Sequence, residues 1–445
     1  PNSFKNRNEI TAVSGKNVIV ILLESMDLSF FNEDIFPDLT PNLKSMQKDE
    51  NWTYFNQLQG TSHMSFGAGY ALMTGMHYPG FLTHNRFMEE ATSINVSGLC
   101  DVFGAAGYNM EVILSTPAFS ASDKFYELYG FKVLGYLEDY DKYGITNIEK
   151  NGWGGAKDRD IFRLAKSRFD YLSKQKSPFF LEILTINAHH PEGICDTRAE
   201  FINNCIETAI KEYDLLIKDF LDYIAKSDVY KDTIVLILPD HKAHGIIESK
   251  VKDLDRSLFF YINKKRNDIK ADLSAPLNYP YIQQLICDIA EIKSNTLLLG
   301  ELFAGYPPKI KQQDINDISK ILFNYEKSYL TNEITIEKNR KGYTLSDRDN
   351  NTIYLPIIRD DDYAALIYNR SKNEYHLNKN YMINRMPPLH TAYFLIKKYG
   401  DKLHIYIGDN KSFGKNFLFD ANDEITVNPA DAYQDKETLN MMSPY

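Results

Sequence analysis

Three side chains of the metal-ligating kind follow two apolar segments of the chain. Glu24 comes directly after residues 18–23, and Asp240 and His241 come after residues 234–238. Continuous apolar runs of this length are typical of buried parallel strands. Open α/β sheets bind ligands at the carboxyl ends of their strands. We therefore expect the three side chains to meet at one edge of one sheet.

Each of these residues has a simpler explanation when it is considered alone. An isolated Glu24 is more often a salt-bridge partner, and an isolated Asp-His pair more often caps a turn beside a surface histidine. Carboxylate oxygens together with one imidazole are suitable ligands for a divalent cation. Their combination at two strand ends therefore favours a metal site.

A threonine lies between these two segments at a predicted helix start. Gly60 and Thr61 precede residues 62–73, which have small side chains and helical spacing. Backbone N–H groups and the helix dipole favour an anion at such a position. A bound metal lowers the pKa of a hydroxyl and polarises a phosphoryl oxygen. The residues together predict a metal-assisted transferase or hydrolase.

Apolar strands alternate with helices over the first 300 residues or so. Further strands are predicted at residues 110–114, 178–186, 233–238 and 258–262, and residues 200–225 form a strongly amphipathic helix. This alternation predicts an α/β fold with a mostly parallel central sheet flanked by helices.

The pattern changes after about residue 305, where short stretches with interleaved polar residues replace the long apolar runs. Antiparallel strands are predicted at residues 333–337, 352–357, 364–369, 391–397 and 402–407, after a helix at 314–325. We therefore predict three parts, which are a linker at residues 1–15, a catalytic domain at 16–304 and a smaller β-rich C-terminal part at 305–445.

Composition excludes some classes of function. The chain has 445 residues and a net charge of −10, which argues against nucleic acid as a partner. No apolar run reaches the roughly 18 residues that a membrane helix needs. The sequence begins at Pro1, and we expect a membrane anchor upstream of the linker.

Four cysteines divide into two kinds. Cys195 and Cys205 bracket a short polar loop, so they either form a disulfide in an oxidising compartment or remain two free thiols. Cys100 and Cys287 lie in apolar helical patterns and are predicted to be buried.

Several short motifs occur in an order that resembles the alkaline phosphatase/sulfatase superfamily. The closer likeness is to its phosphoglycerol transferase branch, which includes the osmoregulated periplasmic glucan phosphoglycerol transferases and the lipoteichoic acid synthases. The resemblance covers about residues 16–300. It rests on Glu24-Ser25, the segment 36–43, Gln57-Leu58-Gln59-Gly60-Thr61, Asn151-Gly152-Trp153-Gly154, His189-His190-Pro191-Glu192-Gly193 and Asp240-His241.

The resemblance implies a role for each motif residue. Thr61 would be the nucleophile and a metal ligand, and it would complete a Mn²⁺ site with Glu24, Asp240 and His241, with Mg²⁺ or Zn²⁺ as alternatives. His189 would contact the phosphoryl group or protonate the leaving group. Residues expected near the substrate are Trp153, Lys157, Asp158, His190 and Lys124.

The expected roles of Trp153, Lys124 and Lys157 are less direct. Trp153 is nearly as readily explained as a core residue. Ser122 or Asp123 takes the place of an arginine with which the lipoteichoic acid synthases bind substrate. Either Lys124 or Lys157 is therefore expected to contact the phosphate instead, or the donor differs.

The resemblance also implies a reaction, a location and partners. The donor would be the phospholipid phosphatidylglycerol, the acceptor a cell-envelope glycan, and the enzyme would act at the membrane surface outside the cytoplasm. Sulfate ester hydrolysis is disfavoured because Thr61 replaces the residue that matures to formylglycine. Alternatives are a phosphoethanolamine transferase, a phosphodiesterase, or a non-catalytic glycan-binding module. His63, Lys242 and His244 are expected at the surface.

Overall fold

The computed structural model describes most of the first 304 residues and the strands of the C-terminal part. The described ranges are 10–60, 64–77, 98–119, 122–190, 193–194, 205–296, 298–304, 334–339, 342–346, 352–355, 363–369, 374–378, 391–399, 402–408, 416–420 and 425–427. The chain forms two compact units, one of residues 1–81 and 95–320 and one of residues 82–94 and 321–445. The predicted boundary at residue 304 adjoins a segment outside the described residues and stays a prediction.

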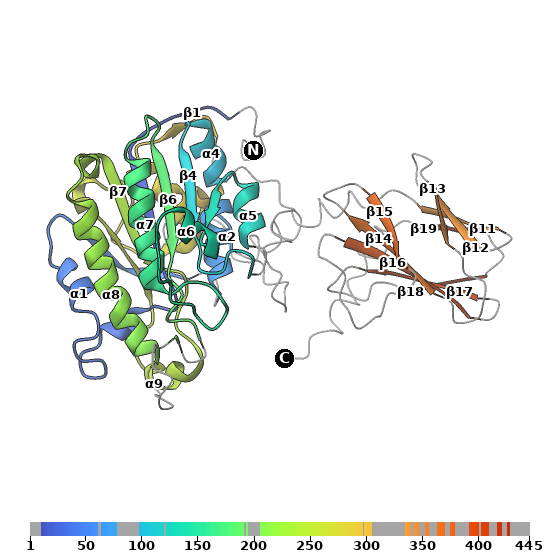
Figure 1. The fold of residues 1–445 in the computed structure, drawn as a ribbon, viewed down its shortest axis with the longest axis horizontal. Helices are drawn as coiled ribbons and strands as arrows, with labels where there is room; N and C mark the ends of the chain where they lie inside the picture. The colour runs from blue at the N-terminus through green and yellow to red at the C-terminus, as the bar shows by residue number, and fades with distance from the viewer. Residues whose placement is uncertain are drawn as a thin grey trace. The chain divides into compact units, whose positions relative to one another are not determined.

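An eight-stranded sheet with the order β5-β4-β6-β2-β7-β8-β3-β9 forms the centre of the first unit (Figure 1). The strands from β5 to β7 run parallel, whereas β8 pairs antiparallel with both β7 and β3. The strands are β2 (Asn17–Leu23), β3 (Thr53–Gln59), β4 (Asn109–Ile113), β5 (Lys132–Leu134), β6 (Phe179–Leu184), β7 (Thr233–Pro239), β8 (Leu258–Ile262) and β9 (Leu277–Asn278). The predicted α/β fold with a mostly parallel sheet is confirmed.

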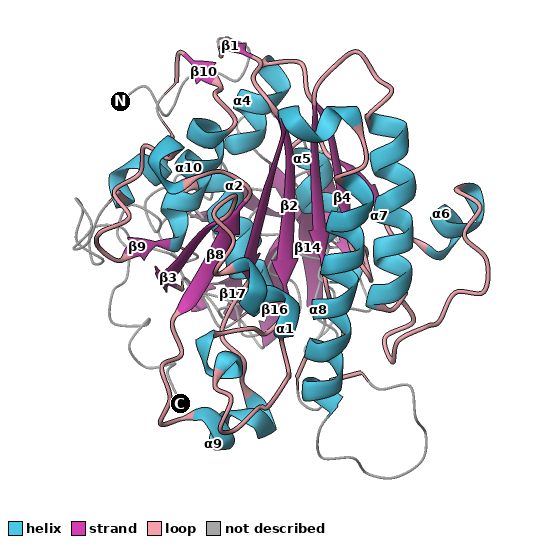
Figure 2. Cartoon of the chain, turned by 90° about the vertical axis from the view of Figure 1, so that its left-hand side faces the viewer, coloured by secondary structure: helices cyan, strands magenta, loops and turns pink. Residues whose placement is uncertain are grey.

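Helices cover both faces of this sheet (Figure 2). On one face α7 and α8 pack together over the central strands, and on the other α2 packs with α4 and α10. The helices are α1 (Pro41–Met46), α2 (Ser65–Thr74), α4 (Leu99–Ala105), α5 (Ser122–Leu128), α6 (Leu137–Lys142), α7 (Asp158–Leu172), α8 (Cys205–Ile224), α9 (Glu248–Val251) and α10 (Ile282–Ile289). Because both faces are covered, β7 is buried throughout and β2 from Val18 onward.

Two sequence predictions about helices change in detail. The helix after Gly60 begins at Ser65 rather than Ser62, because Met64 still has extended backbone angles. The amphipathic helix is described from Cys205 onward and buries its apolar stripe against the sheet, as predicted. Among the described residues, no helix combines the length and apolar character that a membrane crossing requires.

The bonding state and the burial of the described cysteines agree with the sequence predictions. Cys205 is disulfide-bonded, and Cys195 lies outside the described residues. Cys100 and Cys287 are buried free thiols, as predicted.

The second unit holds two antiparallel sheets. Their strand orders are β13-β12-β11-β19 and β15-β14-β16-β17-β18. The strands are β11 (Ile334–Asn339), β12 (Gly342–Ser346), β13 (Thr352–Leu355), β14 (Tyr363–Asn369), β15 (Glu374–Asn378), β16 (Thr391–Tyr399), β17 (Lys402–Gly408), β18 (Asn416–Asp420) and β19 (Ile425–Val427). The β-rich character and the five predicted strands are confirmed, and the predicted helix at 314–325 lies outside the described residues.

Candidate metal centre

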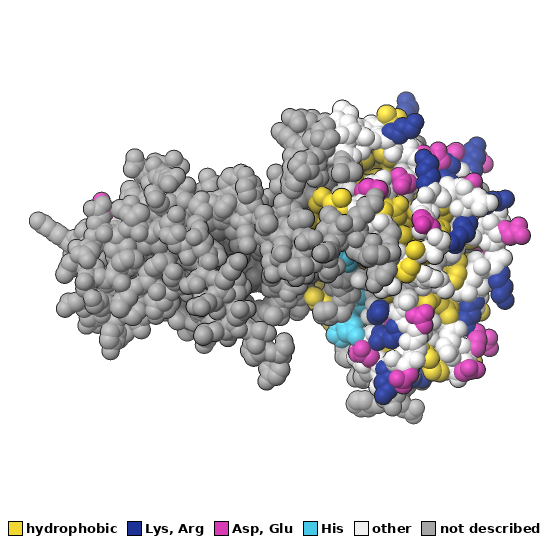
Figure 3. Space-filling model, turned by 180° about the vertical axis from the view of Figure 1, so that it is seen from behind, with side chains coloured by type: hydrophobic (Ala, Val, Ile, Leu, Met, Phe, Trp, Pro, Cys, Tyr) yellow, Lys and Arg dark blue, Asp and Glu magenta, His cyan; other side chains and the backbone are white. Residues whose placement is uncertain are grey.

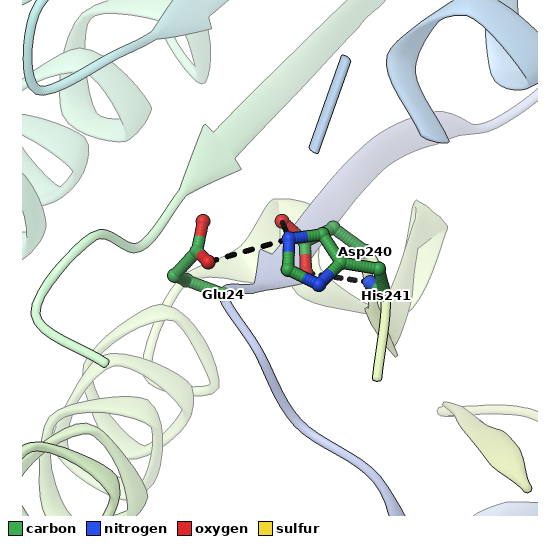
Figure 4. Close-up of side chains that lie close together, drawn as sticks. All are labelled: Glu24, Asp240 and His241. Carbon is green, nitrogen blue, oxygen red and sulfur yellow. Dashed lines mark hydrogen bonds and ion pairs between the residues drawn. The ribbon is translucent and has the colours of Figure 1, made fainter. Parts of the chain in front are cut away.

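Glu24, Asp240 and His241 meet at the carboxyl edge of the central sheet (Figure 4). Strands β2 and β7 are neighbours, and Leu23 is paired with Pro239, so the next residues along both strands lie side by side. All three side chains are buried, and one ligand atom from each lies within 4.8 Å of the other two. His241 Nε2 is 3.4 Å from Glu24 Oε1 and 3.6 Å from Asp240 Oδ2.

A sharp turn after β2 aims Glu24 into this cluster. Ser25 has a positive φ of 53°, and its backbone N–H donates to Asp240 Oδ1 at 3.0 Å. The Ser25 hydroxyl donates to Glu24 Oε1 at 2.6 Å, and the Glu24 N–H donates to Thr185 Oγ1 at 2.9 Å. These bonds link the ends of three adjacent strands and fix the positions of both carboxylates.

The orientation of His241 suits a metal ligand. Its Nδ1 lies 2.8 Å from the carbonyl oxygen of Lys242, and because a carbonyl can only accept, Nδ1 carries a proton. The other nitrogen, Nε2, faces the two carboxylates. Histidines that bind metals commonly donate their second N–H to a backbone carbonyl in this way.

The three groups shift one another's pKa values strongly. Burial alone would raise the pKa of Glu24, but the charge of His241 and its hydrogen bond outweigh burial and hold that pKa well below its usual range. Burial, together with the neighbouring Glu24, raises the pKa of Asp240 to about 7. Burial lowers the pKa of His241, yet the two carboxylates raise it to about 9. The cluster therefore stabilises positive charge at its centre, which fits a divalent cation.

Ser65 also contacts the residues of this centre, although no motif in the sequence marks it. Its hydroxyl, in the first turn of α2, donates to Glu24 Oε2 at 2.9 Å and lies 3.5 Å from His241 Nε2. Thr61 and His63 lie outside the described residues. Thr61 precedes Ser65 by four peptide units, which span at most ~15 Å. Ser65 therefore shows that α2 begins at the metal centre.

A buried ion pair ties together the two loops that carry the ligands. Asp27, three residues after Glu24, is fully buried, and its Oδ2 accepts from the Ala243 N–H at 3.2 Å and from Arg256 Nη2 at 3.0 Å. Arg256 Nη2 also donates to the Ala243 carbonyl. Burial raises the pKa of Asp27, and the bonds from Ser29 and Arg256 counter that effect in part. We call Asp27 and Arg256 the loop clamp.

A row of aromatic rings leads from the metal centre to the surface. His241 and His244 have ring centroids 5.2 Å apart, His244 and His190 4.0 Å, His190 and His189 4.7 Å, and His189 and Trp153 4.6 Å. Figure 3, in which histidine is cyan, shows histidine side chains close together on this surface. His190, His189 and Trp153, which are expected near a substrate, therefore lie in one row of rings that begins at His241.

This ring row corrects two expectations. Trp153 is 44% exposed, so the core explanation for it is wrong. His244 is half-buried rather than a free surface residue, because it packs between His190 and His241. Burial, with the neighbouring His241, lowers the pKa of His244 to about 4. Lys242 is exposed, as predicted.

Comparison with known proteins identifies the family. The family model described as Sulfatase matches residues 16–269 of this chain. The chain belongs to the Sulfatase family.

Curated relatives of this Sulfatase-family chain include two enterobacterial proteins named phosphoglycerol transferase I. The protein from Salmonella newport is 25% identical over 356 residues, which are 76% of this chain and 45% of that protein. The protein from Escherichia coli is 26% identical over 266 residues, which are 57% of this chain and 33% of that protein. The match thus spans less than half of each relative.

Solved structures share the fold of this Sulfatase-family chain. A protein of the alkaline phosphatase superfamily from Vibrio parahaemolyticus has a TM-score of 0.52 at 17% identity, covering 96% of this chain and 88% of that chain. A lipoteichoic acid synthase from Listeria monocytogenes has a TM-score of 0.52 at 16% identity, covering 71% of this chain and 92% of that chain. At these identities the likeness shows the fold alone.

Asp158, which the sequence places near the substrate, lies inside the Sulfatase domain at the start of α7. It is fully buried, and its two carboxylate oxygens accept from the backbone N–H groups of Ile186 and Asn187 at 2.7 and 3.1 Å. Burial raises its pKa to about 7. Asp158 therefore positions the loop that carries His189, and its contact with a substrate stays a prediction.

The two lysines expected at the substrate lie in ion pairs instead. Lys124 is exposed and lies 3.7 Å from Glu127, within α5. Lys157 lies 3.3 Å from Glu149. In the described part of the chain, neither lysine contacts Glu24, Asp240 or His241. A phosphate contact from either one stays a prediction.

Proposed function

We propose that this chain is a metal-dependent phosphoglycerol transferase. It would move glycerol phosphate from phosphatidylglycerol to a cell-envelope glycan through an intermediate on Thr61. The observation that carries the proposal is the buried cluster of Glu24, Asp240 and His241 at the first turn of α2. The names of the curated relatives support the transferred group.

Glu24, Asp240, His241 and Thr61 would hold Mn²⁺, with Mg²⁺ or Zn²⁺ as alternatives. Such a metal, when bound, lowers the pKa of a hydroxyl and stabilises charge on the phosphoryl oxygens. The chemistry of the donor set fits this role, since hard carboxylate oxygens and one imidazole face one point.

The chain's own groups would carry out two displacements at phosphorus. The Thr61 oxygen attacks the phosphorus of the lipid head group, the bond to the diacylglycerol oxygen breaks, and diacylglycerol leaves with a proton. A glycan hydroxyl then attacks the same phosphorus, and Thr61 regains its hydroxyl. Two such steps predict ping-pong kinetics.

We assign the movement of the proton to His189. Its Nδ1 lies 2.6 Å from the carbonyl oxygen of His190, so Nδ1 is the donor and Nε2 remains for the reaction. As an imidazolium, His189 would protonate the leaving diacylglycerol oxygen, and as a neutral ring it would accept the proton of the glycan hydroxyl. Trp153, whose ring contacts that of His189, would pack against the glycerol head group.

We also propose an extracytoplasmic location. The disulfide at Cys205 supports it, because disulfides persist in oxidising compartments. The upstream membrane anchor stays a prediction.

A panel of lipids tests the proposal. Vesicles of phosphatidylglycerol or phosphatidylethanolamine would be incubated with the protein, Mn²⁺ and a glucan acceptor, and diacylglycerol and modified glucan would be quantified. We expect turnover of phosphatidylglycerol that is lost in Thr61→Ala and partly kept in Thr61→Ser.

The other outcomes of this panel assign the alternatives. Turnover of phosphatidylethanolamine alone would indicate a phosphoethanolamine transferase, and lipid cleavage without transfer would indicate a phosphodiesterase. Glycan binding with no cleavage of either lipid would make the chain a non-catalytic binding module. Each of these results would contradict the proposal.

A further inference from the structure

An open pocket of about 490 Å³ lies on the catalytic unit, away from the metal ligands. It is formed by the last turns of α7 and Lys174 just beyond them, by the start of β5, and by the last residue of α6 and Tyr143 after it. Four cations and two tyrosines line it, namely Lys132, Lys142, Arg168, Lys174, Tyr143 and Tyr171. We call it the basic pocket.

The basic pocket lies at the opposite end of the sheet from the metal centre. Glu24 and Asp240 follow the last residues of their strands, whereas Lys132 is the first residue of β5. Strands β5, β4, β6, β2 and β7 are parallel, so the start of β5 faces the other edge. The seven residues of β2 span about 20 Å, so the two sites do not share side chains.

Arg168 forms a rigid floor for this pocket. Its Nε and Nη2 donate to the two oxygens of Glu111 at 2.7 and 2.6 Å, and both residues are buried. The guanidinium is stacked between Tyr143 and Tyr171, at 4.4 Å from each ring centre. Among the described residues no partner is found for its Nη1. The pocket therefore has a fixed N–H donor that needs no reordering when an anion binds.

The lysines around this floor are incompletely neutralised. Lys132 lies 3.3 Å from Glu111 and donates to the Tyr143 hydroxyl at 2.9 Å. Lys142 and Lys174 are exposed, and no acidic partner is found for either in the described ranges. Glu111 and Asp170 offset half of the four cations, so a positive pocket remains on a chain whose net charge is −10.

A solvated cationic face would be the simplest explanation of these lysines. That explanation does not account for three features of the pocket. They are its concave shape, the stacked Arg168 guanidinium and the half-exposed Tyr171 ring. A ring face beside cations suits a sugar that carries negative groups, because the sugar stacks on the tyrosine while the cations contact its charges.

We propose that the basic pocket binds the phosphate groups of a phosphorylated glycan. This proposal rests on the proposed function, since the product of phosphoglycerol transfer is a glycan that carries phosphodiesters. A glycan that is long enough would reach from the pocket toward the metal centre. Binding in the pocket would keep a modified glycan on the enzyme, so further groups would be added to the same chain.

Binding of defined ligands to the full chain tests this proposal. Isothermal titration calorimetry would compare a glucan oligosaccharide carrying phosphoglycerol, the same oligosaccharide without it, inorganic phosphate, and vesicles containing phosphatidylglycerol. We expect the phosphorylated oligosaccharide to bind at least fivefold more tightly than the unmodified one, and more tightly than inorganic phosphate.

A matched pair of double variants locates the site. Lys142→Glu with Lys174→Glu reverses two pocket charges, and Lys48→Glu with Lys226→Glu reverses two exposed charges elsewhere. We expect affinity for the phosphorylated oligosaccharide to fall on the order of tenfold in the pocket variant and less than twofold in the control. Circular dichroism and the melting temperature should match between the two.

The outcomes separate this proposal from the proposed function. Diacylglycerol release from phosphatidylglycerol reports on the metal centre alone, and we expect it to be unchanged in the pocket variant. Equal binding by both double variants, or equal binding of modified and unmodified oligosaccharide, would overturn the proposal. The pocket variant could instead lose binding only to vesicles, which would assign the pocket to a membrane surface. It could also lose binding only to inorganic phosphate, which would assign the pocket to free phosphate. Either result would overturn the proposal.

Discussion

The two ends of the central sheet carry opposite charges in opposite settings. At the carboxyl end, Glu24 and Asp240 are buried and fixed by hydrogen bonds from neighbouring strands. At the other end, Lys142 and Lys174 stand in an open pocket without acidic partners among the described residues. Buried and fixed ligands select a small ion by geometry, whereas exposed lysines select by charge and are screened by salt.

The largest effect is expected from removing one buried ligand. Glu24→Gln keeps the volume of the side chain and removes a charge from the metal centre. We expect the affinity for Mn²⁺ to fall more than ~100-fold, because metals bind carboxylate oxygens far better than amides. Isothermal titration calorimetry would measure it.

The matched control for this prediction is Glu182→Gln. Glu182 is an equally buried glutamate in β6, but its side chain contacts Tyr126 rather than the metal centre. Its substitution should leave metal affinity within twofold. Equal loss in both variants would mean that burial, not ligation, makes Glu24 important.

The loop clamp should have the next largest effect. Asp27→Asn weakens the bonds that join the two ligand loops, so we expect metal affinity to fall about tenfold. Glu248→Gln is the control, because Glu248 is the exposed partner of the same arginine, Arg256. Unchanged affinity in Asp27→Asn, at an unchanged melting temperature, would show that the loops hold their ligands without the clamp.

Glu182 lies midway along β6, between the two ends of the central sheet. It should affect the stability of the fold without affecting binding at the metal centre or in the basic pocket. Burial, countered in part by the Tyr126 hydrogen bond, raises its pKa to about 7, and no hydrogen-bond partner of its Oε2 is found among the described residues. The folded chain thus holds this proton more tightly than the unfolded chain, in which the pKa is about 4.5. The stability from Glu182 is complete below pH 4.5 and is lost as pH rises through 7.

Glu182→Gln should remove this pH dependence. At pH 8.5 we expect a gain in unfolding free energy of up to ~3 kcal/mol over the unsubstituted chain, and a gain of only ~0.8 kcal/mol at pH 5. Thermal unfolding at the two pH values would measure it. An equal change at both would show that Glu182 does not titrate in this range.

The smallest effect is expected from salt, which should weaken binding at the two ends of the sheet to different extents. Raising ionic strength from about 0.05 to about 0.5 M should weaken anion binding in the basic pocket severalfold, since exposed charges are screened. Binding of Mn²⁺ in the buried centre should change less. The reverse order would contradict the assignment of the two sites as buried and open.

The sequence predicts that Glu24, Asp240 and His241 lie together because its signals are local. Each ligand follows an apolar run, and the parallel pairing of Leu23 with Pro239 places the following residues together. The β-rich character of the second unit is also visible in turn residues and short alternating runs. Strands β12, β15, β18 and β19 were missed, because short polar strands depend on partners that are distant in sequence.

The supporting residues could not be predicted from the sequence. Asp27 and Arg256 are 229 positions apart, and nothing near Arg256 distinguishes it from a residue in a surface turn. Ser65 resembles any hydroxyl in the first turn of a helix. Asp158 follows a family motif, and nothing in that motif indicates that its carboxylate accepts hydrogen bonds from two backbone N–H groups. Such roles depend on contacts that folding alone creates.

The most direct test of the account is mass spectrometry of the peptide that contains Thr61. The protein would be incubated with phosphatidylglycerol and Mn²⁺ without a glycan, quenched in acid and digested. We expect a glycerophosphoryl group on Thr61 that is absent in Thr61→Ala and in Glu24→Gln. Cleavage of the lipid with no modified Thr61, or with the group on another residue, would contradict it.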